Sequence, residues 1–119
     1  MLRNLPVLLD GYKLMVTEDP TVKMYEKDGK QVLATDTEGA SLYTVTLFVK
    51  PPADSSGRMG KGMEVKVTLE TDPGEVGEGS RVELVNPRIS QWEIDGRAGV
   101  SWRATGVKPA SPQRTVTAA

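Results

Sequence analysis

The chain has 119 residues, of which 15 are basic and 16 acidic, so its formal net charge is −1, and 38% of its residues are hydrophobic. These values predict one soluble globular domain, and no apolar run approaches the roughly 20 residues that span a bilayer. Because the chain contains neither histidine nor cysteine, it lacks the most common general base, the thiol nucleophile and the preferred metal ligands. We therefore expect no enzyme, no metal, no cofactor and no membrane contact. The apolar run at the N-terminus is too short for a signal peptide, so we expect a cytoplasmic location.

Apolar residues recur at every second position along much of the chain, which predicts β-strands rather than helices. The first candidate segment, 5–9, is too short to decide between a strand and a helical turn. Further strands are expected at 13–16, 21–26, 41–50, 63–70, 81–85, 88–94 and 99–107. The cleanest alternation, in 63–70, places four residues on the face expected to join the core: Met63, Val65, Val67 and Leu69.

The connections between these strands carry turn chemistry. Asp28-Gly29 and Asp95-Gly96 predict tight hairpins, because glycine accepts the positive φ of a type I′ turn. The segment 51–62 is rich in proline, serine and glycine and is expected to form a long loop. The segment 71–79 is expected to form an acidic connector.

Short strands in a chain of this size need a closed arrangement, because an open sheet would leave bare edges. We expect an all-β fold, a small OB-like Greek-key barrel of five to six strands. A two-sheet sandwich is the alternative. The single domain is expected to cover 1–107, with the barrel core in 13–107 and a flexible C-terminal tail in 108–119.

Cationic residues and aromatic rings fall where such a barrel exposes its hairpins and loops. Binding a single strand without sequence preference requires a cationic groove for phosphates and flat rings on which bases stack. The candidate nucleic-acid-binding residues are Lys23, Tyr25, Lys27 and Lys30 in the first hairpin, Arg58 and Lys61 in the long loop, Lys66 on a core strand, and Trp92, Arg97 and Arg103 in the last hairpin. Acidic residues gather in 70–78, and we expect that segment on the opposite side of the molecule.

The aromatic residues divide between core and surface roles. Tyr25 alternates with two lysines, as a stacking ring between phosphate contacts would. Trp92 lies just before a turn and can be either exposed or buried, whereas Trp102 follows the apolar face of its strand and suits the core at least as well as stacking. Phe48 lies on a threonine-rich face, where an exposed ring would suit a base or a partner protein.

The segment 81–109 reads RVELVNPRISQWEIDGRAGVSWRATGVKP. Its stretch 95–104, an Asp-Gly turn followed by an alternating strand, resembles the last hairpin of small OB-fold single-stranded DNA-binding proteins of phages and plasmids. The layout of 13–109 is also similar to actinobacterial plasmid proteins described as replication, integration and excision activators. The resemblance implies a single-stranded DNA-binding protein of a mobile genetic element, which coats DNA during replication or transfer. Small proteins of this kind usually act as oligomers, so a homodimer is expected.

One feature departs from the cellular single-strand binding proteins, because the chain ends in TVTAA and has no acidic, Phe-terminated tip. The alternative function is that of a non-enzymatic structural or interaction protein of a phage or plasmid. That alternative predicts exposed apolar side chains at a subunit contact, with candidates at Leu5, Val7, Leu8, Leu9 and Phe48.

Overall fold

A computed structural model describes residues 2–52 and 60–110 of the chain. Over these residues the structure consists of strands, turns and loops, so the all-β prediction is confirmed. None of the described residues belongs to a helix long and apolar enough to cross a membrane. The strands are β1 (Leu5–Pro6), β2 (Lys13–Val22), β3 (Met24–Lys27), β4 (Lys30–Leu33), β5 (Tyr43–Lys50), β6 (Met63–Leu69), β7 (Arg81–Val85), β8 (Arg88–Ile94), β9 (Arg97–Ala104) and β10 (Gly106–Pro109).

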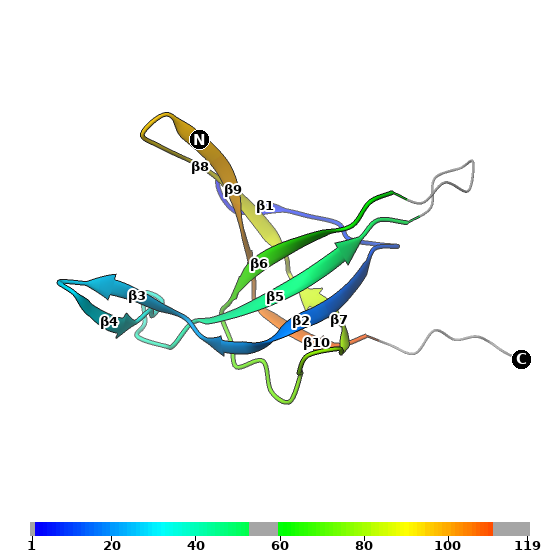
Figure 1. Ribbon diagram of the computed structural model, residues 1–119, viewed down its shortest axis with the longest axis horizontal. Helices are drawn as coiled ribbons and strands as arrows, with labels where there is room; N and C mark the ends of the chain where they lie inside the picture. The colour runs from blue at the N-terminus through cyan, green and yellow to red at the C-terminus, as the bar shows by residue number, and fades with distance from the viewer. Residues whose placement is uncertain (1, 53–59, 111–119) are drawn as a thin grey trace, which may run out of the picture.

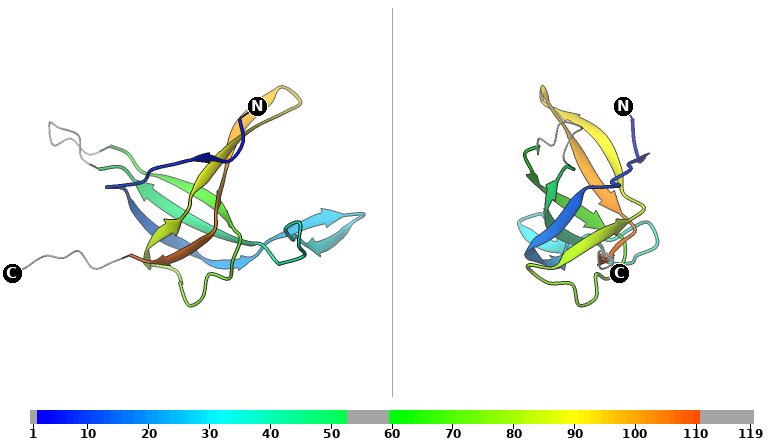
Figure 2. Two further views of the ribbon diagram at one scale, coloured as in Figure 1. Left: turned by 180° about the vertical axis from the view of Figure 1, so that it is seen from behind. Right: turned by 90° about the vertical axis from the view of Figure 1, so that its right-hand side faces the viewer.

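The main sheet follows the order β1-β8-β9-β6-β5-β2-β7-β10. β7 and β8 are two halves of one bent strand, and β9 and β10 are two halves of the next, because only one or two residues separate the halves. β8 pairs with β9 near one end of the sheet, and β7 pairs with β10 at the other end. Because each bent strand therefore takes part at both ends, the sheet curls round on itself (Figures 1 and 2). Counted in this way, the sheet has five long strands: β2, β5, β6 and the two bent strands. These five form the OB-like barrel that was predicted.

Two seams of this barrel are short. β6 pairs with β9 in parallel over three residues on each strand, from Val67 to Leu69 and from Trp102 to Ala104. β2 pairs with β7 at only two positions. The barrel is therefore partly open, as five-stranded barrels of this kind are.

The two Asp-Gly pairs form the hairpins that the sequence predicts. Asp28 and Gly29 have φ values of 53° and 78°, and Asp95 and Gly96 have values of 52° and 80°. Two positive φ values in succession are those of a type I′ turn, whose twist matches that of the flanking strands. The two hairpins, β3–β4 and β8–β9, project from the barrel as separate arms (Figure 1).

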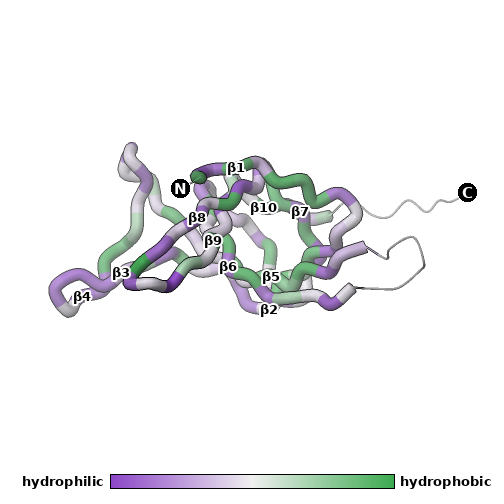
Figure 3. Tube along the Cα trace, turned by 90° about the horizontal axis from the view of Figure 1, so that it is seen from above, coloured by the Kyte–Doolittle hydropathy of each residue, from purple (hydrophilic) through white to green (hydrophobic). Residues whose placement is uncertain are grey.

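The core lies inside the barrel and consists mainly of aliphatic side chains from five strands, β2, β5, β6, β7 and β9. The largest fully buried ones are Val16, Val45, Leu47, Val67 and Leu69. Figure 3 shows the corresponding contrast, with a hydrophobic trace along β5 and a hydrophilic tip on the β3–β4 hairpin. One core prediction was wrong: Met63 is 66% exposed. The reason is that β9 joins β6 only from Val67 onward, so no paired neighbour covers the first residues of β6 on that side.

Short strands lie near both ends of the described residues. Segment 5–9 begins as a short strand, in which Leu5 pairs with Ile89 of β8. At the other end β10 runs on to Pro109, and Lys108 pairs with Glu83 of β7. The remainder of the expected tail, 111–119, lies outside the described residues.

Candidate nucleic-acid interface

A groove lies between the two projecting hairpins, along the edge of β6. It comprises a larger hollow of about 710 Å³ and an adjoining one of about 350 Å³. The two hollows share four lining residues: Lys23, Thr68, Ser101 and Trp102. We call these joined hollows the arm groove. Its lining residues come mainly from β6, β8 and β9 and from the end of β2, and Figure 1 shows the β3–β4 arm and the β8–β9 arm diverging from the barrel.

The arm groove exists because β6 and β9 diverge. Their pairing begins at Val67 and Trp102, so residues 63–66 of β6 and 97–101 of β9 separate like the limbs of a V. Side chains alternate across a strand, and β6 therefore turns Lys66 and Thr68 outward while Val67 and Leu69 enter the core. The open seam thus places a cationic and a hydroxyl side chain beside the groove.

A cluster of charges lies where β6 and β9 pair. Arg88 Nη2 donates to Glu70 Oε1 at 2.8 Å, and Arg103 Nε donates to Glu70 Oε2 at 2.6 Å. Lys23 Nζ donates to the Thr68 hydroxyl at 2.7 Å. The cluster therefore holds three cations and one carboxylate, so its net charge is positive and favours an additional anion.

The ionisation of this cluster reflects its crowding. Burial lowers the pKa of Lys23, and the nearby Arg103 guanidinium lowers it further. Burial alone would raise the pKa of Glu70, but the hydrogen bonds from Arg88 and Arg103 outweigh it, and the pKa falls below its ordinary value. Glu70 therefore keeps its negative charge to a lower pH than a solvated glutamate, whereas Lys23 loses its proton more readily than a solvated lysine. A negative charge bound beside Lys23 would favour the protonated form of this lysine.

Trp92 supplies a flat ring on the β8–β9 wall of the arm groove. It stands opposite Gly99 across the hairpin, and its indole lies over that glycine: a Cβ at Gly99 would be 2.6 Å from Trp92 Cζ2. The indole therefore rests on the sheet, and Trp92 remains 39% exposed. The next pair on the same face of the hairpin, Ser90 and Ser101, is small and leaves open space beside the ring.

The structure brings together four of the ten predicted residues. Lys23, Lys66, Trp92 and Arg103 all line the arm groove. The exposed side chains of Tyr25, Lys27 and Lys30 extend along the β3–β4 arm.

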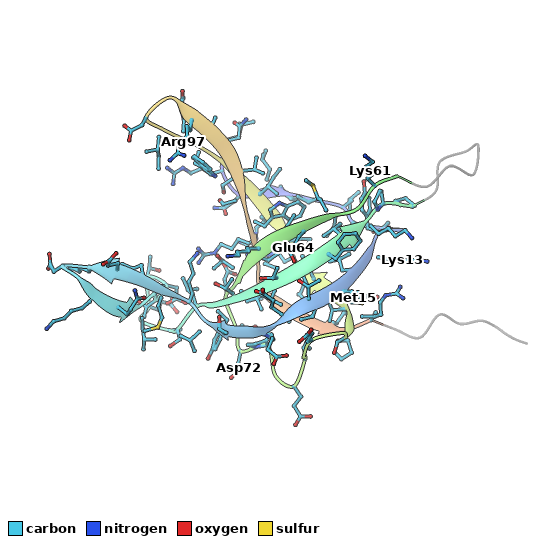
Figure 4. All side chains as sticks on the ribbon, viewed as in Figure 1. Lys13, Met15, Lys61, Glu64, Asp72 and Arg97 are labelled. Atoms are coloured by element: carbon cyan, nitrogen blue, oxygen red, sulfur yellow. The ribbon has the colours of Figure 1, made fainter. Side chains whose placement is uncertain are left out.

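The other three predicted residues lie elsewhere. Figure 4 shows Arg97 on the β8–β9 arm, near its tip, and Lys61 at the opposite end of β6. Lys61 lines a different cavity. Arg58 falls outside the described residues.

Several groove residues were missed by sequence reasoning. Arg3 enters because β1 pairs with β8, a contact between distant parts of the chain. Trp102 combines the two roles considered for it, since it packs against the core and also lines the groove.

The expected separation of charge is incomplete. Asp72 lies on the underside of the molecule, away from the two arms (Figure 4). The expectation for Glu70 was wrong. This residue directly follows β6 and forms ion pairs with Arg88 and Arg103 beside the groove. Glu64 also lines the groove. The acidic connector therefore turns away from the groove only after Glu70.

No family model matches the sequence, and no curated protein matches it either. Among solved structures, the fold is similar to the crystal structure of a small single-stranded DNA-binding protein from Streptomyces coelicolor, with a TM-score of 0.49 and 13% sequence identity. The match covers 90% of this chain and 94% of that one.

Proposed function

We propose that this protein binds single-stranded DNA in the arm groove, without sequence preference. One observation carries the proposal: a half-exposed indole, a floor of small residues and two cations meet in one hollow. Trp92, Ser90, Ser101, Lys23 and Arg103 all line it. Sequence-independent binding of a single strand uses this combination of stacking surface and phosphate contacts.

The phosphate position lies between Lys23 and Arg103. Lys23 gives one of its three N–H donors to Thr68, which is neutral and adds no compensating charge. Among the hydrogen bonds of the described residues, the Arg103 side chain uses only its Nε. The remaining N–H groups of both side chains are available to phosphate oxygens, and charge-assisted bonds of this kind are the stronger class.

The base position lies on Trp92. Stacking on an aromatic side chain contributes about 1–3 kcal/mol per base and tolerates any base. In a duplex the base faces are already covered by neighbouring bases, so the ring favours a single strand. Lys66 in the groove, together with Tyr25, Lys27 and Lys30 on the β3–β4 arm, continues the contacts to flanking nucleotides.

At the cellular level, we propose a role in coating single-stranded DNA during replication or transfer of a phage or plasmid, in the cytoplasm. The resemblance of segment 95–104 to the last hairpin of such proteins supports this role. The contribution of the protein is binding rather than catalysis.

The test is a titration of a fluorescein-labelled dT oligomer, followed by fluorescence anisotropy at several salt concentrations. We expect binding at low salt that weakens steadily as salt rises, because phosphate contacts release condensed cations. A duplex of equal length should bind more weakly, and a ribo-oligomer measures the preference between DNA and RNA. Lys23→Ala should reduce affinity.

The matched control is Lys108→Ala, which removes an equal charge from β10, where Lys108 is 3.8 Å from Glu83. If the wild type does not bind at low salt, or if both alanine variants bind equally well, the proposed site is wrong.

A further inference from the structure

The segment 2–4 runs beside β8 and forms one wall of the arm groove. Arg3 and Asn4 both line the smaller hollow, which the Trp92 side chain also lines. In the main sheet β8 lies between β1 and β9, and the segment 2–4 directly precedes β1. The segment therefore reaches the hollow from the edge of β8 that β9 does not cover.

The segment is attached to β8 largely through side chains of that strand. Asn4 N donates to Ser90 Oγ at 2.9 Å, and Leu2 N donates to Gln91 Oε1 at 3.2 Å. A bond between two backbone groups adds to these, from Gln91 N to the Leu2 carbonyl at 2.9 Å. The backbone is thus held on both sides of Arg3. The Arg3 side chain is exposed and takes part in none of the ion pairs formed by the described residues.

The conformation of Asn4 determines how the segment lies on β8. Its φ is 54°, which is in the left-handed region and interrupts the extended chain just before β1. Asparagine enters this region more readily than most residues, whereas a β-branched residue strongly disfavours it. At this turn the Asn4 N–H donates to the side chain of Ser90 rather than to a backbone carbonyl. Asn4 therefore orients the segment that carries Arg3.

The charges of the smaller hollow come from two sides. Its lining includes three cations, Arg3, Lys23 and Arg103, and no acidic residue. In the sheet order β1-β8-β9-β6, Arg3 comes from the β1 side, whereas Lys23 is bonded to Thr68 of β6. The paired strands β8 and β9 lie between them. A nucleotide whose base stacks on Trp92 thus has a cation available on each side.

We propose that Arg3 binds a second phosphate of the single strand, and that Asn4 is a positioning residue that holds Arg3 at the groove. Lys23 and Arg103 bind the phosphate on one side of the stacked nucleotide, and Arg3 binds the phosphate on the other. The inference rests on the proposed function, because it assigns to Arg3 a phosphate of the strand that stacks on Trp92. Guanidinium groups suit this contact because they donate paired hydrogen bonds to phosphate oxygens.

The first test is an anisotropy titration of a labelled dT oligomer at graded salt. We expect Arg3→Ala to weaken binding about tenfold at low salt, the equivalent of one charge-assisted hydrogen bond. The slope of log affinity against log salt should fall by about one, because one phosphate contact is lost. Arg81→Ala is the matched control, since Arg81 is an exposed arginine of β7 that does not line the arm groove. It should leave affinity and slope unchanged.

A pair of substitutions at Asn4 tests the positioning role. Glycine accepts a positive φ freely, so Asn4→Gly should bind as the wild type does, whereas Asn4→Val should bind as weakly as Arg3→Ala. In the Arg3→Ala background, Asn4→Val should have no further effect. Thermal unfolding of each variant reports whether the barrel is intact, which is expected because Arg3 and Asn4 are exposed.

The outcomes separate this inference from the proposed function. If the wild type does not bind, the proposed function fails and the inference fails with it. If Lys23→Ala weakens binding and Arg3→Ala does not, the strand binds in the arm groove but the role given to Arg3 is wrong. Equal affinities for Asn4→Gly and Asn4→Val overturn the role given to Asn4.

Discussion

Because the Trp92 indole packs on Gly99, a substitution at Gly99 can displace the ring without removing it. In Gly99→Ala the new Cβ would be 2.6 Å from Trp92 Cζ2 and 2.9 Å from Cε2, so the indole must move off the strand. We expect stability to change by less than about 1 kcal/mol, because alanine is favoured over glycine in a strand and this gain offsets the displaced ring. Affinity for a dT oligomer should fall about 5- to 150-fold, the equivalent of about 1–3 kcal/mol of stacking.

The assay is anisotropy with a labelled oligomer, since it does not depend on tryptophan emission. The informative comparison is a double-mutant cycle with Trp92→Ala. If Gly99 matters only because the Trp92 indole packs on it, Gly99→Ala should not change the affinity further once Trp92 is replaced. Wild-type affinity in Gly99→Ala, or an undiminished loss in the Trp92→Ala background, would refute the stacking position.

Three further predictions concern the charges of the arm groove. Lys66→Ala should reduce the slope of log affinity against log salt by about one, measured by titration at graded salt. The pKa of Lys23 is lowered by burial and by Arg103, and a bound phosphate would raise it, so affinity should fall as pH rises through the lowered pKa. Lys23→Met should remove this pH dependence, and a flat wild-type profile would contradict it. Glu70→Gln should lower the free energy of unfolding by about 1 kcal/mol in urea melts, because Arg88 and Arg103 lose their shared partner, yet tighten DNA binding at low salt; unchanged binding would show that these arginines do not face the ligand.

The strands and hairpins could be predicted from the sequence because their causes are local. Period-two alternation is a property of a few neighbouring residues, and it identified β5 and β6. Type I′ turns depend on the residue pair that forms them, and both Asp-Gly pairs adopt the expected φ values. The same local patterns pointed to Lys23 and Trp92, which the structure places in one hollow.

The missed features depend on contacts between distant segments. Alternation alone places Met63 in the core, but its exposure follows from the point at which β9 joins β6. Composition places Glu70 in an acidic connector, whereas its partners are arginines of β8 and β9. Arg3 reaches the groove through the pairing of β1 with β8. Such contacts are set by sheet closure, which no short window of sequence encodes.

Trp102, together with Met63 and Val65, lines both the hollow between the arms and a hollow of about 310 Å³ at the far end of the barrel. A shift of this one indole, when either compartment is filled, alters the shape of the other. Whatever free energy links the two occupancies through it must act equally in both directions.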